Sequence, residues 1–420
     1  MLSKTQWIVS QLTRTLWVRA SLFAVLAMIT ALIAIPLEHY LNYDFDIAIG
    51  ADSVKDILHI LASSMLAVTT FSLSIMVSAY ASSSSVSPRA TQLTQQDTTT
   101  QNVLATFIGS FLYSLVGIVA LSSHAYGVTG RFILFTVTIG VILLIVITIL
   151  RWIEHLSQLG RLGETVDRVE AATLTAIEER VLFPSLDAKE LDLDNPPDYI
   201  DNTLFHKDIG YIQHIDIEAL NRYAKEHDAE ISLLVGSGDF IHLNRAIGCT
   251  NIELSESFVT AIQSTFTIGS DRSFDQDPGF GMIVLTEIAS RALSQAINDP
   301  GTAIDVINRS IRILSKLKDY KLFKVEQDEI SYQYVRVPCI SIEHILNDMY
   351  LPIARDGAAM AEVHIAIQEA LFALSQLKNQ ALHANLLGVS DLVNQYLAGV
   401  LVIDADREKI NTIMQKIKAP

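Results

Sequence analysis

The chain has 420 residues, of which 50% are hydrophobic and only 18% are charged. Soluble domains carry about 25% charged residues, so an apolar segment must dilute the charge of this chain. The formal net charge of −16 argues against a nucleic-acid partner, because binding DNA or RNA needs a basic surface. Cys249 and Cys339 lie far apart in the sequence and give neither metal-ligand spacing nor a disulfide framework, so we expect no metal and no cofactor.

Four apolar runs near the N-terminus predict transmembrane helices: 20–35, 57–81, 103–122 and 132–150. Each approaches the roughly 20 residues that a helix needs to cross the hydrocarbon core of a bilayer. Helices are expected because lipid cannot satisfy the hydrogen bonds of an exposed backbone. The predicted fold class is therefore a membrane α-helical protein with four transmembrane helices and a C-terminal cytoplasmic α+β domain that is mostly helical.

Basic residues indicate how the spans are oriented. They gather before the first span and after the fourth: Lys4, Arg14, Arg19, Arg151, Arg161 and Arg168. The loop at 38–55 is acidic, and the loop between the third and fourth spans is short. Lysine and arginine accumulate on the cytoplasmic side of a membrane, so the sequence predicts that both termini are cytoplasmic.

Hydroxyl residues recur every fourth position on the second span, at Thr70, Ser74, Ser78 and Ser82. This spacing places them on one ridge of a helix, where we expect them to face protein or water. One interpretation is helix packing through small residues, and the other is a weakly polar pore lining. Pro88 ends the helix, and Arg89 after it is either an interfacial anchor or part of a vestibule that selects anions.

The remainder of the chain is expected to be cytoplasmic. We divide the chain into five segments: residues 1–19 (cytoplasmic N-terminal segment), 20–152 (transmembrane domain), 153–200 (stalk helix and linker), 201–250 (small mixed α/β unit) and 251–420 (mainly helical domain). The stalk is expected to continue the fourth span. The turn Gly236-Ser237-Gly238 suits a hairpin, and it matches neither a nucleotide-binding loop nor a nucleophile elbow.

Two Asp-Pro-Gly triplets mark the helical part, beginning at Asp277 and at Asp299. In each triplet the aspartate can cap a helix while Pro278 or Pro300 fills its first position. The helix between them is expected at 280–297. One of its faces is polar, with Glu287, Ser290, Arg291, Ser294 and Asn298. This face is either solvated, or it forms a subunit contact or a ligand pocket in which capped helix ends attract anions.

Three aspartates precede and open this region, Asp271, Asp275 and Asp277. Their oxygens could hold a divalent cation, although the spacing and the glutamate of a calcium loop are missing, and a solvated capping turn is the simpler interpretation.

The same residues resemble a known family. The resemblance rests on Asp277, Pro278, Phe280, Gly281, Glu287, Arg291, Ser294, Asn298, Asp299, Pro300 and Thr302, with Ser87-Pro88-Arg89 and Gly210-Tyr211. These motifs are similar to those of the domain of unknown function 2254 family, which are predicted bacterial inner-membrane proteins, and the resemblance covers nearly the whole chain. The sequence departs at Ser273, where threonine is common, and at Gln295, where proline is frequent. Without that proline the helix is expected to continue smoothly.

Three functional hypotheses remain open at this point. The first is an oligomeric channel for small ions, a homo-oligomer whose second spans surround an axis, because four apolar spans of one chain would hardly enclose a pathway. The alternative is a membrane-anchored sensor or scaffold whose cytoplasmic domain binds a ligand or partner. An enzyme is the third and least favoured, since the histidines are scattered without metal-ligand spacing.

Overall fold

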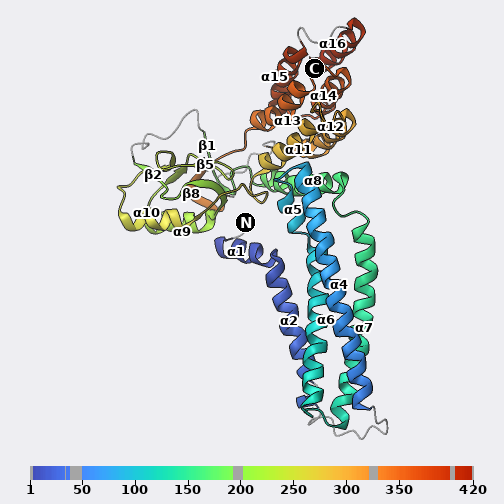
Figure 1. Cartoon of the computed structure of the whole chain (residues 1–420). Coiled ribbons are helices and arrows are strands. Elements are labelled where there is room, and N and C mark those ends of the chain that lie inside the picture. The colour runs from blue at the N-terminus through green and yellow to red at the C-terminus, as the bar shows by residue number, and fades with distance from the viewer. Residues whose placement is uncertain are drawn as a thin grey trace. The chain divides into compact units, whose positions relative to one another are not determined.

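The computed structural model describes residues 3–33, 35–37, 50–192, 202–320, 330–397 and 403–418 (Figure 1). Packing contacts divide the chain into two compact units, one of residues 8–165 and one that combines residues 1–7 with 166–420. Among the described residues of the first unit, four helices are long and apolar enough to cross a bilayer. They are α2 (Leu16–Leu32), α4 (Ala51–Val86), α6 (Thr98–Ser122) and α7 (Val128–Leu156).

Helix α6 is the central element of the transmembrane unit, because α2, α4 and α7 all pack against it. Glycines permit two of these approaches. A Cβ atom on Gly109 would lie 3.3 Å from the carbonyl oxygen of Phe23 in α2, and one on Gly117 would lie 3.0 Å from Cδ1 of Leu58 in α4. Small residues allow such close approach of helices within a membrane. A helix thus occupies the centre of the unit.

The four expected spans are confirmed. All four helices begin before the corresponding apolar runs, and α4 and α7 also end after them. Helix α4 continues to Val86, so Ser82 lies within the helix, and Pro88 follows it. The expected stalk is a separate helix, α8 (Leu162–Leu182), and does not continue α7. Gly160 breaks the chain between them with a φ of +79°, a conformation that favours glycine.

The second unit contains two β-sheets (Figure 1). Its strands are β1 (Ala188–Leu191), β2 (Thr203–Phe205), β3 (Gly210–Ile215), β4 (Ile231–Leu233), β5 (Phe240–Ile241), β6 (Ala246–Thr250), β7 (Phe266–Gly269) and β8 (Tyr332–Pro338). The larger sheet has the order β1-β8-β4-β6-β2, with β1, β8 and β4 parallel and the others antiparallel. The smaller sheet is antiparallel with the order β5-β3-β7.

Helices α9 (Ile217–Glu226) and α10 (Glu256–Ser264) accompany the strands. The sequence also predicts an amphipathic helix at 217–227 with Leu220, Tyr223 and Ala224 facing inward. In the structure the apolar face of α9 supplies Ile217, Leu220 and Ala224 to the core, with Tyr223 packed against it. The sequence also predicts a strand pair at 323–325 and 332–342. The first strand lies outside the described residues, and the second is present as β8.

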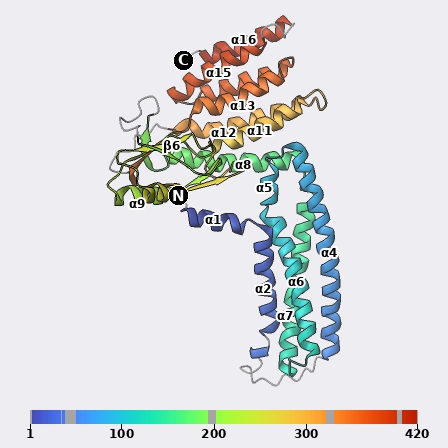
Figure 2. The same cartoon turned by 60° about the vertical axis from the view of Figure 1, so that its left-hand side comes forward.

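The helical part of this unit is a two-layered array (Figure 2). Its members are α11 (Pro278–Ala292), α12 (Pro300–Leu314), α13 (Ile342–Asp356), α14 (Ala361–Ser375), α15 (Gln380–Leu397) and α16 (Asp404–Lys418). Helix α13 packs against both α11 and α15, and α14 packs against both α12 and α16. Successive helix pairs therefore stack, as they do in α-solenoids.

The structure shows different boundaries from those drawn on the sequence for the segments 153–200, 201–250 and 251–420. Helix α8 packs within the second unit from Val166 onward. Strands β7 and β8 come from beyond residue 250 but join the sheets with β3 and β4. The small mixed unit is therefore not confined to 201–250, because its central strands need partners from distant parts of the chain. The segment 1–19 is also divided, since residues 1–7 belong to the second unit.

Candidate functional site

The hydroxyl ridge of α4 lies on the exposed surface of the transmembrane unit. Thr70, Ser74, Ser78 and Ser82 are all exposed. Thr70 Oγ1 donates to the carbonyl oxygen of Leu66 at 2.9 Å, and Ser74 Oγ donates to that of Thr70 at 3.2 Å. A hydroxyl that bonds within its own helix is satisfied without water or a second protein group. The expectation that this ridge must face protein or water assumed that its hydroxyls need partners outside the helix. For Thr70 and Ser74 that assumption does not hold.

A different set of hydroxyls turns inward from α4. Ser72 is fully buried, and its Oγ accepts a hydrogen bond of 3.0 Å from Nε1 of Trp152 in α7. Ser83 is also buried, 3.0 Å from Oγ1 of Thr94 in α5 (Thr91–Gln95). These serines stabilise the packing of the unit. The every-fourth spacing singled out the opposite side of the helix.

The exposed ridge belongs to a longer face of small residues. Ser63, Ala67, Thr70, Ser74, Ser78, Ala81 and Ser85 follow one another at intervals of three or four residues, and all seven are exposed. Such spacing keeps them on one side of the helix over more than five turns. We call this set the small-residue face of α4. Ser82 lies beside it and donates to the carbonyl oxygen of Gly160 at 2.9 Å. Arg89 is exposed in the turn between α4 and α5.

A polar cluster that the sequence did not suggest lies where α6 begins. Asp97 caps α6 by accepting from the backbone N–H groups of Thr99 and Thr100. Its Oδ2 also lies 2.7 Å from Nε2 of His155 in α7 and accepts from the hydroxyl of Thr100. These contacts fix the start of α6 against the end of α7. The only signal in the sequence was an aspartate followed by three threonines, which is typical of a helix N-terminus.

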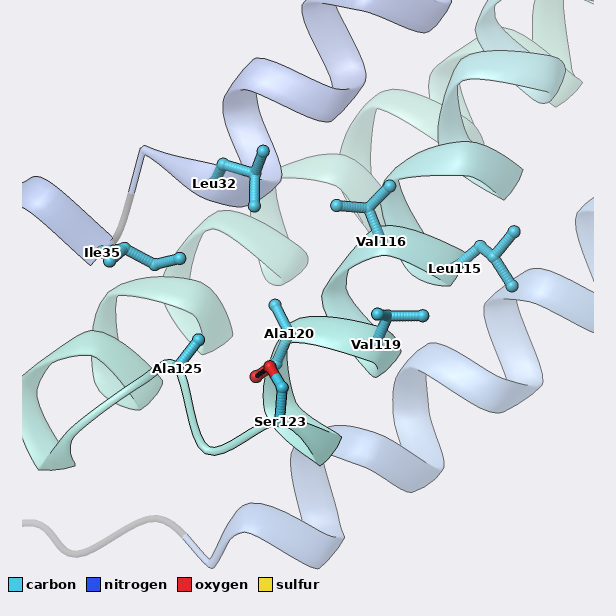
Figure 3. A pocket seen from close by; sticks show the side chains of 8 residues that line it. All are labelled: Leu32, Ile35, Leu115, Val116, Val119, Ala120, Ser123 and Ala125. Carbon is cyan, nitrogen blue, oxygen red and sulfur yellow. Dashed lines mark hydrogen bonds between the residues drawn. The ribbon is translucent and has the colours of Figure 1, made fainter.

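An apolar groove opens on the transmembrane unit between α2, α6 and the turn after α6 (Figure 3). Its volume is about 350 Å³, and it is lined by Leu32, Ile35, Leu115, Val116, Val119, Ala120, Ser123 and Ala125. The hydroxyl of Ser123 donates to the carbonyl oxygen of Ala120, so the lining offers no free polar group that would recognise a solute. This groove suits an acyl chain rather than an ion or a metabolite.

In the second unit, the expected capping by both Asp-Pro-Gly triplets is seen. Asp277 Oδ1 accepts from the N–H of Phe280 at 3.1 Å, and Asp299 Oδ1 accepts from that of Thr302 at 3.1 Å. Pro278 and Pro300 occupy the first helical positions. The bonds from Thr302 hold the pKa of Asp299 below its usual value.

The two triplets differ in what surrounds the aspartate. Asp277 is 6% exposed and forms a bidentate ion pair with Arg272, with Nε–Oδ2 at 2.7 Å and Nη2–Oδ1 at 2.9 Å. Burial raises the pKa of the Asp277 carboxyl, and the Arg272 guanidinium acts against that rise. Gly238 lies so close that a Cβ atom there would come within 2.0 Å of Asp277 Oδ2. The structure thus brings the turn at 236–238 into contact with the triplet that begins at Asp277. Nothing in the sequence indicated that these two segments meet.

Aromatic rings cover this pair. The Arg272 guanidinium lies 5.2 Å from the ring centre of Phe280, and Phe280 lies 4.6 Å from Phe274. Gly281, next in the motif, faces α8, where a Cβ atom would come within 1.9 Å of Thr173 Oγ1. Asp277, Phe280 and Gly281 therefore act together in packing α11 against its neighbours.

The remaining motif residues do not form the single polar face that we expected. Helix α11 ends at Ala292 rather than at 297, so Ser294 and Asn298 lie beyond it. The chain turns there because Asp299 N–H donates to the carbonyl oxygen of Ala292 and Asn298 adopts a φ of +52°. The continuous helix expected from Gln295 is therefore wrong. Glu287 and Arg291 stay on α11, where Glu287 is half-buried and Arg291 is exposed.

The three aspartates do not converge on a cation site. Asp277 is engaged by Arg272, and Asp275 Oδ2 accepts from Trp7 Nε1 at 2.9 Å. No group of three histidine, cysteine, aspartate or glutamate residues in the described part of the chain is arranged to hold a metal ion.

The family comparison describes a membrane protein, and none of the comparisons names an activity. The family model described as "Predicted membrane protein (DUF2254)" matches residues 13–373. Two relatives of similar identity are "Uncharacterized protein MT1328" of Mycobacterium tuberculosis and "Uncharacterized protein Mb1321c" of Mycobacterium bovis. Each is 27% identical over 320 residues, which cover 73% of this chain and 60% of the relative. The match thus spans less than two thirds of the relatives' length. No solved structure matches.

Proposed function

The chain belongs to the DUF2254 family of predicted membrane proteins, and from that premise we propose that it is a self-associating, membrane-anchored sensor. In this proposal the protein lies in the bacterial inner membrane with both termini in the cytoplasm. Copies of α4 meet through the small-residue face, and the second unit binds a ligand. The observation that carries the proposal is the exposure of all seven small residues of that face.

Small side chains favour close contact between membrane helices. Within a bilayer, helices associate by van der Waals packing, and serine, threonine and alanine let two backbones approach closely. Larger apolar side chains flank the face, with Leu66, Phe71 and Val77 each more than half exposed. A flat strip between bulky neighbours suits a second copy of α4, and repetition of one surface gives a closed homo-oligomer.

The cytoplasmic location of both termini is part of the proposal, and the composition of the second unit supports it. Residues 1–7 and 166–420 pack into the same unit, and an even number of spans separates these segments. Green fluorescent protein fused to either end should fluoresce, and alkaline phosphatase fused to either end should be inactive. An active phosphatase at one end would contradict the orientation.

The same exposed face supports a channel as the second candidate. Copies of α4 around an axis would then line a pore for small ions with Thr70, Ser74, Ser78 and Ser82, and Arg89 would stand at its cytoplasmic end. The intrahelical bonds of Thr70 and Ser74 favour the anchored sensor instead, because these hydroxyls need no water. The absence of charged side chains between 57 and 86 points the same way.

The substitution Thr70→Leu tests self-association. A leucine on the small-residue face should hold two helices apart and lower the oligomeric state, which light scattering of the purified protein measures. Thr136→Leu on α7 is the matched control, since Thr136 is also exposed and donates to the carbonyl oxygen four residues earlier. Equal oligomeric states for both variants, or a monomeric parent protein, would overturn the proposal.

Cysteine labelling distinguishes the two candidates. Ser74→Cys is made in a chain whose Cys249 and Cys339 are replaced by serine, and the protein is reconstituted in liposomes. A packed α4 interface should exclude a charged, membrane-impermeant thiol reagent, and ion flux should be absent. Rapid labelling together with flux would favour the channel and reject the anchored sensor.

A further inference from the structure

Helix α8 buries one face, and that face ends in an arginine. Val169, Thr173 and Ile177 are each at most 1% exposed. Arg180 follows at the next position of the same face and is 7% exposed. An arginine is almost never this deeply buried unless its charge is paired.

Among the residues that the structure describes, the guanidinium of Arg180 has no such pair. Its Nε and Nη1 atoms are buried and have no hydrogen-bond acceptor in the described part of the chain. Another inward-facing arginine of this unit behaves differently: Arg309 Nη1 lies 2.8 Å from Oε2 of Glu170. Two unsatisfied donor nitrogens on a buried cation are strongly unfavourable, because the guanidinium cannot lose its proton to escape the penalty.

The side chains that face Arg180 do not neutralise it. Asp277 lies near enough to interact electrostatically with the Arg180 guanidinium, but its carboxylate is already paired with Arg272. Tyr320 and Cys339 carry a phenol and a thiol, which are neutral at pH 7 in their ordinary state. The Tyr320 hydroxyl donates to the carbonyl oxygen of Ile340 at 3.2 Å. Glu179 is the preceding residue of α8 and so points to another side of the helix.

We infer that Arg180 forms part of a binding site for an oxyanion, a phosphate or carboxylate group, in the second unit. A guanidinium presents N–H groups in a planar fork that matches two oxygens of such a group. The missing partner of Arg180 is therefore an acceptor that is both charged and able to take two hydrogen bonds. This inference names the ligand class of the proposed sensor and in that respect rests on the proposed function.

Thermal unfolding of the full-length protein in detergent tests the site. Sodium phosphate and sodium acetate are each compared with sodium chloride at equal ionic strength. The phosphate and acetate samples show whether the site binds a phosphate or a carboxylate group. We expect the Tm to rise by about 2–4 °C in at least one arm. If the anion stays bound through purification, added anion should not raise the Tm. Denaturing the protein should then release about one anion per chain.

Arg180→Met should abolish the rise and the released anion. Its Tm in chloride should equal or exceed that of the parent protein, because a buried unpaired charge has been replaced by an apolar side chain. Arg222→Met makes the same change at an exposed position of α9 and should keep the response. Arg180→Lys keeps the charge but not the fork, and it should weaken the response even if the methionine variant fails to fold.

An equal response in the Arg180 and Arg222 variants would overturn the site, as would no response and no retained anion in the parent. If the parent protein releases no anion, a lower Tm of Arg180→Met in chloride would show that a group of the protein itself already stabilises Arg180. Light scattering of the same samples reports self-association separately, so failure at Arg180 and failure at α4 are distinguishable.

Discussion

Nε1 of Trp7 donates a hydrogen bond of 2.9 Å to Oδ2 of Asp275, which lies 268 positions later in the sequence. Trp7 is 7% exposed and stacks on His214 with ring centres 5.3 Å apart. Lys4 reinforces the attachment, because its backbone N–H donates to Asp216 Oδ2 at 2.6 Å. The start of α1 (Lys4–Thr13) is thus held by the second unit, while its later residues belong to the transmembrane unit.

Trp7→Ala should release this N-terminal segment. Truncating a buried aromatic side chain costs about 3–5 kcal/mol, so amide exchange at Lys4 should accelerate by about a hundredfold or more. Hydrogen–deuterium exchange of the full-length protein measures this at the peptide level. Val9→Ala on the exposed side of α1 is the control and should leave exchange unchanged. Unaltered protection at Lys4 in Trp7→Ala would show that the contact with Asp275 does not hold the segment.

The two Asp-Pro-Gly triplets provide a matched pair of substitutions. Asp277→Ala removes a cap and leaves Arg272 without its partner in a largely buried site, so we expect a loss of about 3–5 kcal/mol in the free energy of unfolding. Asp299→Ala removes a cap from an aspartate with no ion pair among the described contacts, and should cost about 1 kcal/mol. Chemical denaturation of both variants measures the difference. Equal losses would mean that the pair with Arg272 contributes nothing.

Gly281→Ala should destabilise the packing of α11 against α8. The added Cβ would lie 1.9 Å from Thr173 Oγ1 and 2.8 Å from Thr173 Cβ, and overpacking of a core typically costs about 1–3 kcal/mol. Thr173→Ala removes the closest atom, so the double variant should recover part of the loss. Gly279→Ala meets its nearest atom at 3.5 Å and should be neutral or stabilising. The Tm of the four variants decides whether the glycine is required by packing.

The sequence predicted the parts of the fold that local patterns determine. Apolar runs of about 20 residues marked the four spans, and aspartate before proline marked the starts of α11 and α12. Pairings between distant segments carried no local signal. Strand β8 is parallel to both β1 and β4, and β1 lies more than 140 residues before it, so the two-sheet architecture could not be inferred.

The candidate sites show the same limit. Periodicity identified the hydroxyl ridge of α4, but it did not reveal that Thr70 and Ser74 bond to their own helix. Nothing in the sequence distinguished Arg180 from other helical arginines. It became notable only because the fold buries it and its Nε and Nη1 atoms find no hydrogen-bond acceptor among the described residues. Asp97 and His155 lie 58 residues apart and meet only because α6 and α7 pack together.

His364 should make the second unit sensitive to acid. The ring is fully buried in α14, and neither nitrogen has a hydrogen-bond partner among the described residues. Burial lowers its pKa to about 4 from an ordinary value of 6.5, and the backbone of Ala354 acts in the opposite direction. The unfolded chain therefore binds a proton below pH 6.5, whereas the folded chain does so only near pH 4. Stability contributed by the neutral ring is full above pH 6.5 and declines as the pH falls towards 4.

Between pH 7 and pH 5 this linkage amounts to a loss of about 2 kcal/mol in the free energy of unfolding. His364→Leu should remove that part of the pH dependence, because an apolar side chain takes up no proton in either state. His344→Leu on the exposed side of α13 is the control and should retain it. Denaturant midpoints of the three proteins at both pH values provide the measurement. If the parent protein and His364→Leu lost equal stability on acidification, the buried ring would not be the group that titrates.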